Sequence, residues 1–189
     1  MLLNRLTKLL LAGAASCIGM AASAQRDVVL SSNITSLQVT AGNNWLSMPI
    51  INMNDGNPIN ICFDDLTHDY HRYAYKLQHC EADWSPSEGI IDTDYCDGFV
   101  DGDVIDSYAK SVNTNTIYTH YELSIPNERC RLKMSGNYRL AIYDDNDKDT
   151  ILYAHFMVVE PAVKITVEVS SNTDIDANAT HQQVSGSVD

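Results

Sequence analysis

The chain has 189 residues, of which 12 are basic and 25 are acidic, and its formal net charge is −13. A surface this acidic repels nucleic acid and anionic lipid, so we expect neither as a partner. After residue 24, no segment is long and apolar enough to predict a membrane-spanning helix, so no direct membrane span is expected.

Residues 1–24 have the pattern of a cleaved secretory signal peptide, with a basic start, a short apolar run and a small-x-small cleavage site at residues 22–24. Cleavage would start the mature chain at Gln25 and leave 10 basic and 25 acidic residues, a net charge of −15. The alternative is a lipoprotein signal that uses Cys17, but its lipobox lacks the usual leucine. We expect a soluble protein of the periplasm or the cell exterior.

Short segments of alternating apolar and polar residues follow, which is the pattern of half-buried β-strands. They are residues 36–41, 59–65, 71–79, 117–125, 137–143 and 163–169. Residues 151–160 are apolar on both faces, as in a central strand. The alternation predicts that these side chains point inward: Tyr73, Tyr75, Leu77, Ile117, Tyr121, Leu123, Ile125, Tyr138, Leu140 and Ile142. Since no amphipathic helix of ordinary length is found, we predict an all-β fold, an antiparallel β-sandwich of immunoglobulin-like type.

Residues 85–115 form one long stretch with a weak apolar pattern and many turn-forming residues. A loop of this length in a compact domain is usually functional or carries small elements of its own. Residues 160–162 (Glu-Pro-Ala) mark a boundary, beyond which one strand and a polar tail are predicted. We therefore expect residues 25–160 to form an N-terminal β-sandwich domain, and residues 161–189 to form a linker and the first strand of a truncated second domain.

The histidines and acidic residues do not have the spacing of a metal or catalytic site. His68 and His71 would face opposite sides of an extended chain, and His79 and Cys80 are adjacent, so zinc-ligand spacing is missing. The acidic run at residues 143–150 lacks the glycine and glutamate of an EF-hand, although calcium binding by irregular acidic loops stays open. No nucleophile elbow, phosphate-binding loop or dinucleotide fingerprint occurs. We expect no cofactor, no catalytic residue and no enzymatic activity.

Removal of the signal would leave four cysteines: Cys62, Cys80, Cys96 and Cys130. An even number of cysteines in an oxidising compartment allows two disulfides. Three pairings are possible, and the sequence does not choose between them. Free or partly paired thiols are equally compatible with it.

Several motifs occur in a fixed order between residues 36 and 161. They are SLQVT (36–40), FDDL (63–66), YAYKLQHCEADWSPS (73–87), YCDGF (95–99), NTNTIYTHYELSIPN (113–127), SGNYRLAIYD (135–144) and HFMVVEP (155–161). This succession resembles the N-terminal domain of the type IX secretion system plug protein family of Bacteroidota. The tail THQQVSGSVD (180–189) resembles the beginning of that family's second domain.

The resemblance implies a periplasmic protein that associates with the outer-membrane translocon barrel of the type IX secretion system. Such a protein is expected to seal the periplasmic opening of the barrel when no cargo occupies it, a steric task in which no bond is made or broken. The positions that match the family motifs are expected to be structural or to form the interface: His79, Cys80, Asp83, Trp84, Ser87, Thr119, His120, Tyr121, Ser135, Gly136, Asn137 and Tyr138. The other three cysteines of the mature chain depart from that pattern.

Three of the matching positions have specific expected roles. Trp84 is expected to be a large apolar plug at the end of its strand, where the long loop departs. His120, on the polar face of its strand, is expected to hydrogen-bond the loop. Gly136 is expected to supply a turn angle that other residues resist.

Two other functions are compatible with a secreted β-sandwich. A carbohydrate-binding or adhesion module would need an exposed aromatic platform, for which the candidates are Tyr70, Tyr73, Tyr75 and Trp84. A secreted enzyme, such as a hydrolase accessory domain, would need a concave pocket with convergent acids and a histidine.

Overall fold

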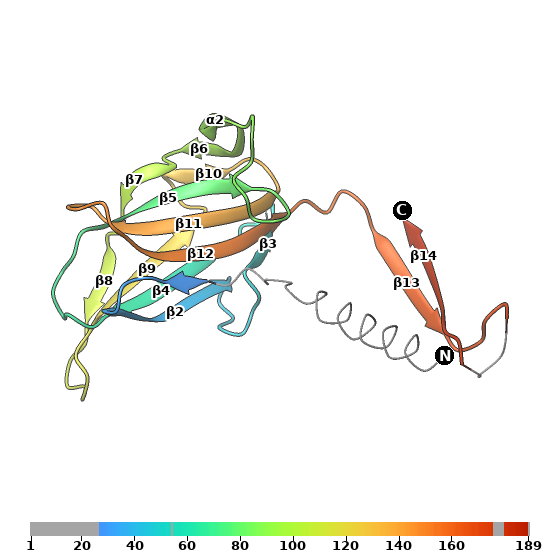
Figure 1. Ribbon diagram of the computed structural model, residues 1–189, viewed down its shortest axis with the longest axis horizontal. Coiled ribbons are helices and arrows are strands. Elements are labelled where there is room, and N and C mark those ends of the chain that lie inside the picture. The colour runs from blue at the N-terminus through green and yellow to red at the C-terminus, as the bar shows by residue number, and fades with distance from the viewer. Residues whose placement is uncertain (1–26, 54, 176–179, 189) are drawn as a thin grey trace, which may run out of the picture.

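The computed structural model describes residues 27–53, 55–175 and 180–188. Its regular secondary structure is almost all β-strand, and the strands form two facing sheets, a small two-stranded sheet and, apart from them, a two-stranded hairpin at the C-terminal end (Figure 1). The predicted all-β sandwich is thereby confirmed. The predicted signal peptide and Gln25 lie outside the described residues.

The first sheet has the strand order β1-β12-β11-β5-β7, and β3 joins it by pairing with β12. Its strands are β1 (Val28–Val29), β3 (Ile50–Asn52), β5 (Tyr73–Cys80), β7 (Asp101–Val104), β11 (Gly136–Asp144) and β12 (Thr150–Val159). The second sheet has the order β2-β4-β9-β8. Its strands are β2 (Ile34–Ala41), β4 (Ile59–Asp65), β8 (Ser107–Lys110) and β9 (Thr119–Ile125). Pairing within both sheets is antiparallel except between β3 and β12, which run parallel.

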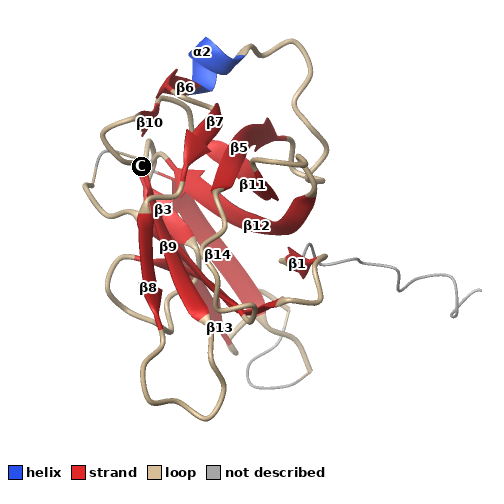
Figure 2. Cartoon of the chain, turned by 90° about the vertical axis from the view of Figure 1, so that its left-hand side faces the viewer, coloured by secondary structure: helices blue, strands red, loops and turns tan. Residues whose placement is uncertain are grey.

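The long stretch between residues 85 and 115 carries small elements of its own. It contains the one-turn helix α2 (Asp92–Tyr95), β6 (Cys96–Gly98), β7 and β8. β6 pairs with β10 (Cys130–Leu132), and this small sheet and α2 sit together at one end of the molecule, next to β7 (Figure 2). The stretch thus supplies an edge strand to each large sheet and a cap at one end.

The core lies between the two sheets and follows the predicted alternation. All the predicted inward side chains are buried except Ile117, which is 53% exposed. That residue was predicted wrongly because β9 begins at Thr119, so the alternating strand does not reach it. Aromatic rings dominate the interior: Phe63 stacks on Tyr121 with ring centroids 5.2 Å apart. Burial of such a side chain stabilises the fold by about 1.5–3 kcal/mol.

The C-terminal segment holds a hairpin of β13 (Ile165–Ser170) and β14 (Gln183–Val188). The sequence predicted one strand here, but the structure has two, because the polar tail pairs with the alternating strand in register. The apolar side chains of one hairpin face are exposed rather than half-buried: Ile165, Val167, Val169, Val184 and Val188. Among the described residues, no helix is long and apolar enough to cross a membrane.

Candidate functional site

The motifs of residues 73–87 and 135–144 meet at one corner of the sandwich, around His79. β5 and β11 pair so that Tyr138 lies opposite His79. The buried imidazole of His79 donates from Nε2 to the backbone oxygen of Ser135, at 3.2 Å, and accepts at Nδ1 from the hydroxyl of Ser87, at 2.8 Å. Since a carbonyl oxygen only accepts, this contact assigns a proton to Nε2, and the hydroxyl of Ser87 can donate to Nδ1.

Gly136 lies directly against the ring of His79, where a side chain would not fit. Its φ of +144° lies in a region that side chains rarely adopt, which agrees with the predicted special backbone angle. A Cβ at this position would collide with Nε2 of His79 and lie 3.0 Å from Cε1. On the other side, the ring of Tyr138 packs edge-on to the imidazole at 5.1 Å, and its hydroxyl donates to the backbone oxygen of Met134 at 2.6 Å.

The turn that follows β5 is tied together by short polar contacts. The carboxylate of Asp83 accepts from the hydroxyl of Ser85, at 2.6 Å, and from its backbone N–H, at 3.0 Å. These two hydrogen bonds hold the pKa of Asp83 below its usual value. The side chain of Asn137 donates to the backbone oxygen of Glu81 at 2.9 Å, which fastens the turn to β11.

Trp84 lies on the outer face of the first sheet and not inside the sandwich. Its backbone has a φ of +67°, and its half-buried ring packs edge-on against the imidazole of His155 at 5.1 Å. His155 points outward from β12, opposite to its inward neighbours Ala154 and Phe156. Trp84 therefore folds back from the end of β5 over β12 and covers an outward histidine, which helps to explain why β12 is apolar on both faces.

Two residues of the motif at 113–127, Thr119 and Tyr121, hold the connection between β4 and β5 in place. The hydroxyl of Thr119 donates to the backbone oxygen of Asp69 at 2.9 Å. The hydroxyl of Tyr121 accepts from the backbone N–H of His71, at 2.8 Å, and donates to the backbone oxygen of the same residue, at 3.0 Å. Because both backbone groups of His71 are satisfied by one buried tyrosine, the loop is held in a single position.

A buried carboxylate, Asp65, stands at the same end of the molecule. It accepts from Nδ1 of His71 at 2.6 Å, from the hydroxyl of Tyr73 at 2.9 Å and from the backbone N–H of Thr67 at 2.9 Å. Burial by itself would raise the pKa of Asp65, but the hydrogen bonds outweigh it and hold this pKa below the usual value. The sequence analysis did not single out Asp65, although its position at the end of a strand, in FDDL, was a signal for it.

His120 bonds to a neighbouring strand instead of the long loop. Its Nδ1 and the carboxylate of Asp64 on β4 are 2.7 Å apart. The two residues are direct cross-strand partners in the β4–β9 register. The expected contact is therefore corrected: the imidazole bonds to Asp64, and the long stretch meets His120 only through strand pairing, in which Ala109 of β8 lies opposite it.

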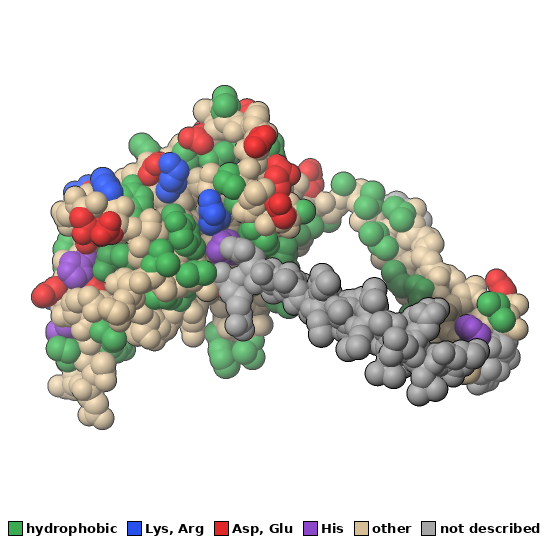
Figure 3. Space-filling view, viewed as in Figure 1, with side chains coloured by type: hydrophobic (Ala, Val, Ile, Leu, Met, Phe, Trp, Pro, Cys, Tyr) green, Lys and Arg blue, Asp and Glu red, His purple; other side chains and the backbone are tan. Residues whose placement is uncertain are grey.

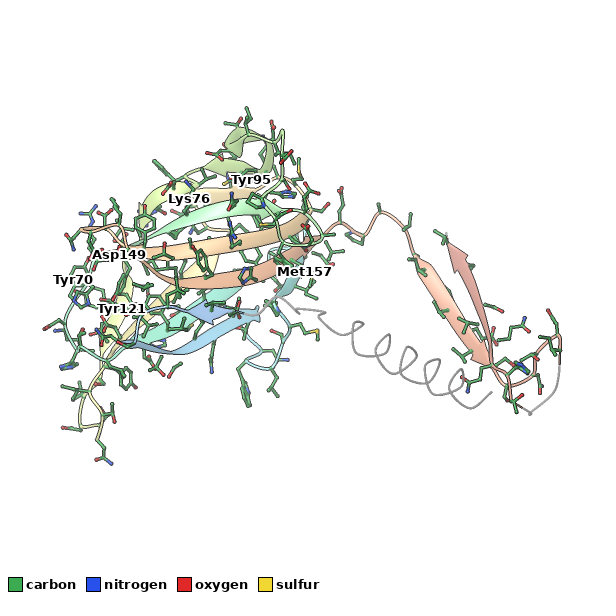
Figure 4. The ribbon with its side chains drawn as sticks, viewed as in Figure 1. Tyr70, Lys76, Tyr95, Tyr121, Asp149 and Met157 are labelled. Atoms are coloured by element: carbon green, nitrogen blue, oxygen red, sulfur yellow. The ribbon has the colours of Figure 1, made fainter. Side chains whose placement is uncertain are left out.

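The motif residues form two clusters at opposite ends of the sandwich. Figure 4 shows Tyr121 at one end, near Tyr70, and Tyr95, which packs against His79, toward the other end near Met157. β5 joins the two clusters. In both places the side chains bond to backbone groups of turns, so each cluster fixes the path of the chain.

The four residues considered for the aromatic platform of a carbohydrate-binding module do not form one together. Tyr73 and Tyr75 are buried in the core. Tyr70 is exposed but packs against Tyr108, with ring centroids 4.8 Å apart, and Trp84 belongs to the other cluster. A sugar ring needs neighbouring exposed aromatic faces, which these four residues do not offer together.

One polar hollow brings acids and a histidine together. It measures about 580 Å³ and is lined by His71, Asp65 and the acidic turn between β11 and β12. Asp144 accepts from the backbone N–H of Asn146, at 2.8 Å, so the turn is bonded within itself. Among the described residues, no serine, threonine or cysteine side chain hydrogen-bonds to the imidazole of His71, and no three acidic, histidine or cysteine side chains are arranged to hold a metal ion.

The four cysteines fall into two kinds of position. All four are free thiols in the structure. Cys96 and Cys130 are buried, and their sulfur atoms are 3.1 Å apart. Cys62 is half-buried on β4, and Cys80 is buried at the end of β5.

A charge-free apolar loop joins β2 to β3, and the sequence analysis missed it. From Ser31 to Asn54 the chain has no acidic, basic or histidine residue, which is the signal that was available. The loop exposes Trp45, Leu46 and Met48, each by 71–73%. In Figure 3 the lower edge of the sandwich, which carries β2 in Figure 1, shows apolar but no charged side chains.

Short hydrogen bonds hold this loop in shape. The hydroxyl of Ser47 donates to the backbone oxygen of Ala41 at 2.7 Å and accepts from its N–H at 2.8 Å. The N–H of Ser47 donates to the backbone oxygen of Asn44 at 2.9 Å. A rigid loop loses little conformational entropy on binding, so its exposed tryptophan, leucine and methionine have the character of contact residues.

Comparisons with known proteins agree with this architecture. Residues 34–160 match the family described as "Type 9 secretion system plug protein 1st domain", and the chain belongs to this family. The chain also resembles a crystal structure of a hypothetical protein from Parabacteroides merdae, with a TM-score of 0.73 and 42% sequence identity. The match covers 86% of this chain and 41% of that protein, so the chain spans less than half of its length. No curated protein matches.

The description of this family names a plug protein of the type 9 secretion system, and residues 34–160 of the chain correspond to its first domain. The resemblance noted from the motifs is thereby confirmed. The two clusters of motif residues lie within the matched range, which runs from the start of β2 to the residue after β12.

Proposed function

We propose that this protein is a periplasmic component of the type IX secretion system that associates with the outer-membrane translocon barrel and seals its periplasmic opening. The observation that carries the proposal is the family match over residues 34–160, which covers nearly the whole sandwich. The protein acts by occupying space and performs no catalysis. A predicted signal peptide at residues 1–24 would export it.

The architecture suits a steric task. A body that blocks a wide pore must hold its shape, and here two sheets with a shared aromatic core are closed at both ends by clusters that bond to turns. Loops on such a scaffold serve as contact surfaces. We further propose that the exposed hairpin of residues 165–188 begins a second domain, which would cover its apolar face.

We assign the contact with the translocon to the loop that exposes Trp45, Leu46 and Met48. These side chains are apolar, uncharged and held in place, whereas the rest of the surface is strongly acidic. The buried centres of protein interfaces are depleted of charged residues and enriched in tryptophan and methionine. The loop is therefore the surface best suited to bury itself in a partner.

An affinity purification tests both statements. The tagged full-length protein is purified from detergent-solubilised outer membranes of its own organism, and the recovered proteins are identified by mass spectrometry. We expect the translocon barrel in stoichiometric amount with the wild type, and at least tenfold less with the triple variant Trp45→Ser, Leu46→Ser, Met48→Ser. The matched control is Val112→Ser with Ile117→Ser, which removes exposed apolar side chains from another loop.

The outcomes separate the two statements. Absence of the barrel with the wild-type protein, under conditions that keep the translocon intact, would contradict the proposed function. Full recovery with the triple variant would contradict the assignment of the loop and leave the function standing. Equal loss with the control variant would show that exposed apolar side chains act without specificity.

A further inference from the structure

Two thiols meet in the small sheet at the end of the sandwich. Cys96 on β6 and Cys130 on β10 have their sulfur atoms 3.1 Å apart and are 2% and 0% exposed. They are diagonal neighbours across the strand pair, since Cys96 lies opposite Leu132 and Cys130 lies opposite Gly98. A sulfur–sulfur bond measures about 2.05 Å, so a small rotation of the two side chains would bring the atoms to bonding distance.

Gly98 makes this approach possible. Its φ is +116°, and a Cβ at this position would collide with the backbone oxygen of Arg129 and lie 2.9 Å from the carbonyl carbon. The backbone N–H of Phe99 donates to that same oxygen at 2.8 Å. The absence of a side chain at residue 98 therefore lets β10 lie close against β6 and places Cys130 beside Cys96.

The other two cysteines are excluded from this pair and from each other. Cys62 points to the outer face of the second sheet, because its neighbours Ile61 and Phe63 point inward. Cys80 lies on the outward side of the first sheet, since Leu77 and His79 of the same strand face the opposite way. The whole core lies between Cys62 and Cys80, so a bond between them would require unfolding.

We propose that Cys96 and Cys130 form a structural disulfide in the exported protein, and that Cys62 and Cys80 remain thiols. Among the cysteine pairings that the sequence leaves open, this one is selected by the structure. It rests on the proposed function, which includes export, because disulfides form and persist in oxidising compartments. The oxidant is a disulfide of the compartment, carried by a protein or by a small thiol.

The reaction balances as a thiol–disulfide exchange in two steps. The thiolate of Cys96 attacks one sulfur of the oxidant, forms a mixed disulfide and displaces the other sulfur as a thiolate. The thiolate of Cys130 then attacks the sulfur of Cys96 and displaces the second oxidant sulfur. Two electrons pass to the oxidant, which becomes two thiols, and the protons of the two cysteines go to solvent or to the displaced thiolates.

The two sulfur atoms lie in hydrogen-bonding contact inside the folded domain. Both sulfurs are buried in the folded chain, so the bond forms while the small sheet is still closing. Afterwards the same burial protects it from reduction.

The bond would lock α2 and β6 to the rest of the domain. The small sheet has three residue pairs, which is little to hold a cap in place. α2 ends in Tyr95, whose ring packs near Tyr138 and His79 and whose hydroxyl donates to the backbone oxygen of Leu77 at 3.2 Å. A bond at the adjacent Cys96 therefore also keeps the cluster around His79 closed.

Peptide mapping tests the pairing directly. The protein isolated from the cell envelope, and the same chain refolded with a mixture of reduced and oxidised glutathione, are alkylated without reduction and digested with trypsin and a glutamate-specific protease. Glu81 and Glu88 separate Cys80 from Cys96, and cleavage after Arg129 and Arg131 releases Cys130 on its own dipeptide. We expect this dipeptide linked to the peptide of Cys96, with the other two cysteines alkylated.

Alkylation of both Cys96 and Cys130 in the refolded chain, or a link that includes Cys62 or Cys80, would overturn the pairing. A linked pair in the refolded chain together with free thiols in the chain from cells would overturn the disulfide as a feature of the exported protein. The second result would speak against export into an oxidising compartment, which is part of the proposed function. The first result would speak against the pairing itself, so the two failures can be told apart.

Thermal unfolding provides a second measurement. A disulfide between Cys96 and Cys130 joins residues 34 positions apart in the chain. Closing a loop of that length raises the melting temperature by an amount on the order of 10 °C. A reductant should therefore lower Tm by about that amount in the wild type and in the matched variant Cys62→Ser with Cys80→Ser, and by nothing in Cys96→Ser with Cys130→Ser. An equal response to reductant in both double variants would contradict the proposal.

Discussion

Single residues decide how the turns of this sandwich are held. His79 bonds on one side to Ser87 and on the other to the backbone of Ser135, so one imidazole links the turn after β5 to the start of β11. The close approach of His79 requires a glycine at residue 136. Side chains of this kind look like candidates for catalysis in a sequence, but their partners here are backbone groups and a turn hydroxyl.

Gly136→Ala should destabilise the domain strongly. The new methyl group would collide with the ring of His79, and the backbone angle itself is unfavourable for alanine, so we expect a loss of about 3–4 kcal/mol in the free energy of unfolding. Gly89→Ala is the matched control, because Gly89 also has a positive φ but open space around it, and should cost about 1 kcal/mol. Denaturant unfolding measures both, and equal losses would contradict the role of the collision.

Asp65 should make stability depend on acid. Its pKa is lowered in the folded state, so the stabilisation is fully present above the unfolded pKa of about 3.9 and is lost as the pH falls through the lower folded value. Asp65→Asn should lose about 2 kcal/mol at pH 7 and show a shallower decline below pH 4. Unfolding of both proteins between pH 2 and 7 tests this, and parallel curves would contradict it.

At the scale of elements, the strands were predictable and their partners were not. Alternation follows from burial on one face, so the inward residues of β4, β5, β9 and β11 are read correctly along the chain. β14 was missed because Gln183–Val188 has few apolar residues and is a strand only through its pairing with β13.

Contacts between distant elements determine other features of the structure. The partner of His120 is set by the register of β4 and β9, and the position of Trp84 by a positive φ that turns it over β12. The periodicity of apolar residues along the sequence predicts neither the partner of His120 nor the position of Trp84. The four cysteines likewise gave three equal pairings in the sequence, and only the meeting of β6 and β10 distinguishes Cys96 and Cys130.

The hairpin of β13 and β14 should add nothing to the stability of the sandwich. Its side chains are almost all exposed, so they bury little surface against the two sheets. A chain that ends at Glu160 should therefore unfold within about 2 °C of the 189-residue chain. Calorimetry measures the difference, and a loss of more than about 5 °C would show that the hairpin supports the sandwich.

Taken as a whole, the protein is a rigid acidic body that presents an uncharged apolar loop between β2 and β3. The polar hollow at one end of the sandwich has acids and a histidine, but these groups bond to one another and to the turns around them. The proposed steric closure of an opening needs a defined shape, rigidity and a contact surface, and the chain offers all three. Membership of the plug family supports the proposed role in type IX secretion.

The most direct test of the central claim is the permeability of the outer membrane in cells that lack this protein. A hydrophilic dye too large for ordinary porins is added, and its entry into the periplasm is measured in the parent, the deletion strain and strains that carry the wild type or the Trp45, Leu46, Met48 triple variant. We expect the dye to enter the periplasm in the deletion strain and with the triple variant, and not to enter with the wild type. Unchanged permeability after deletion, with the translocon present at its normal level, would contradict it.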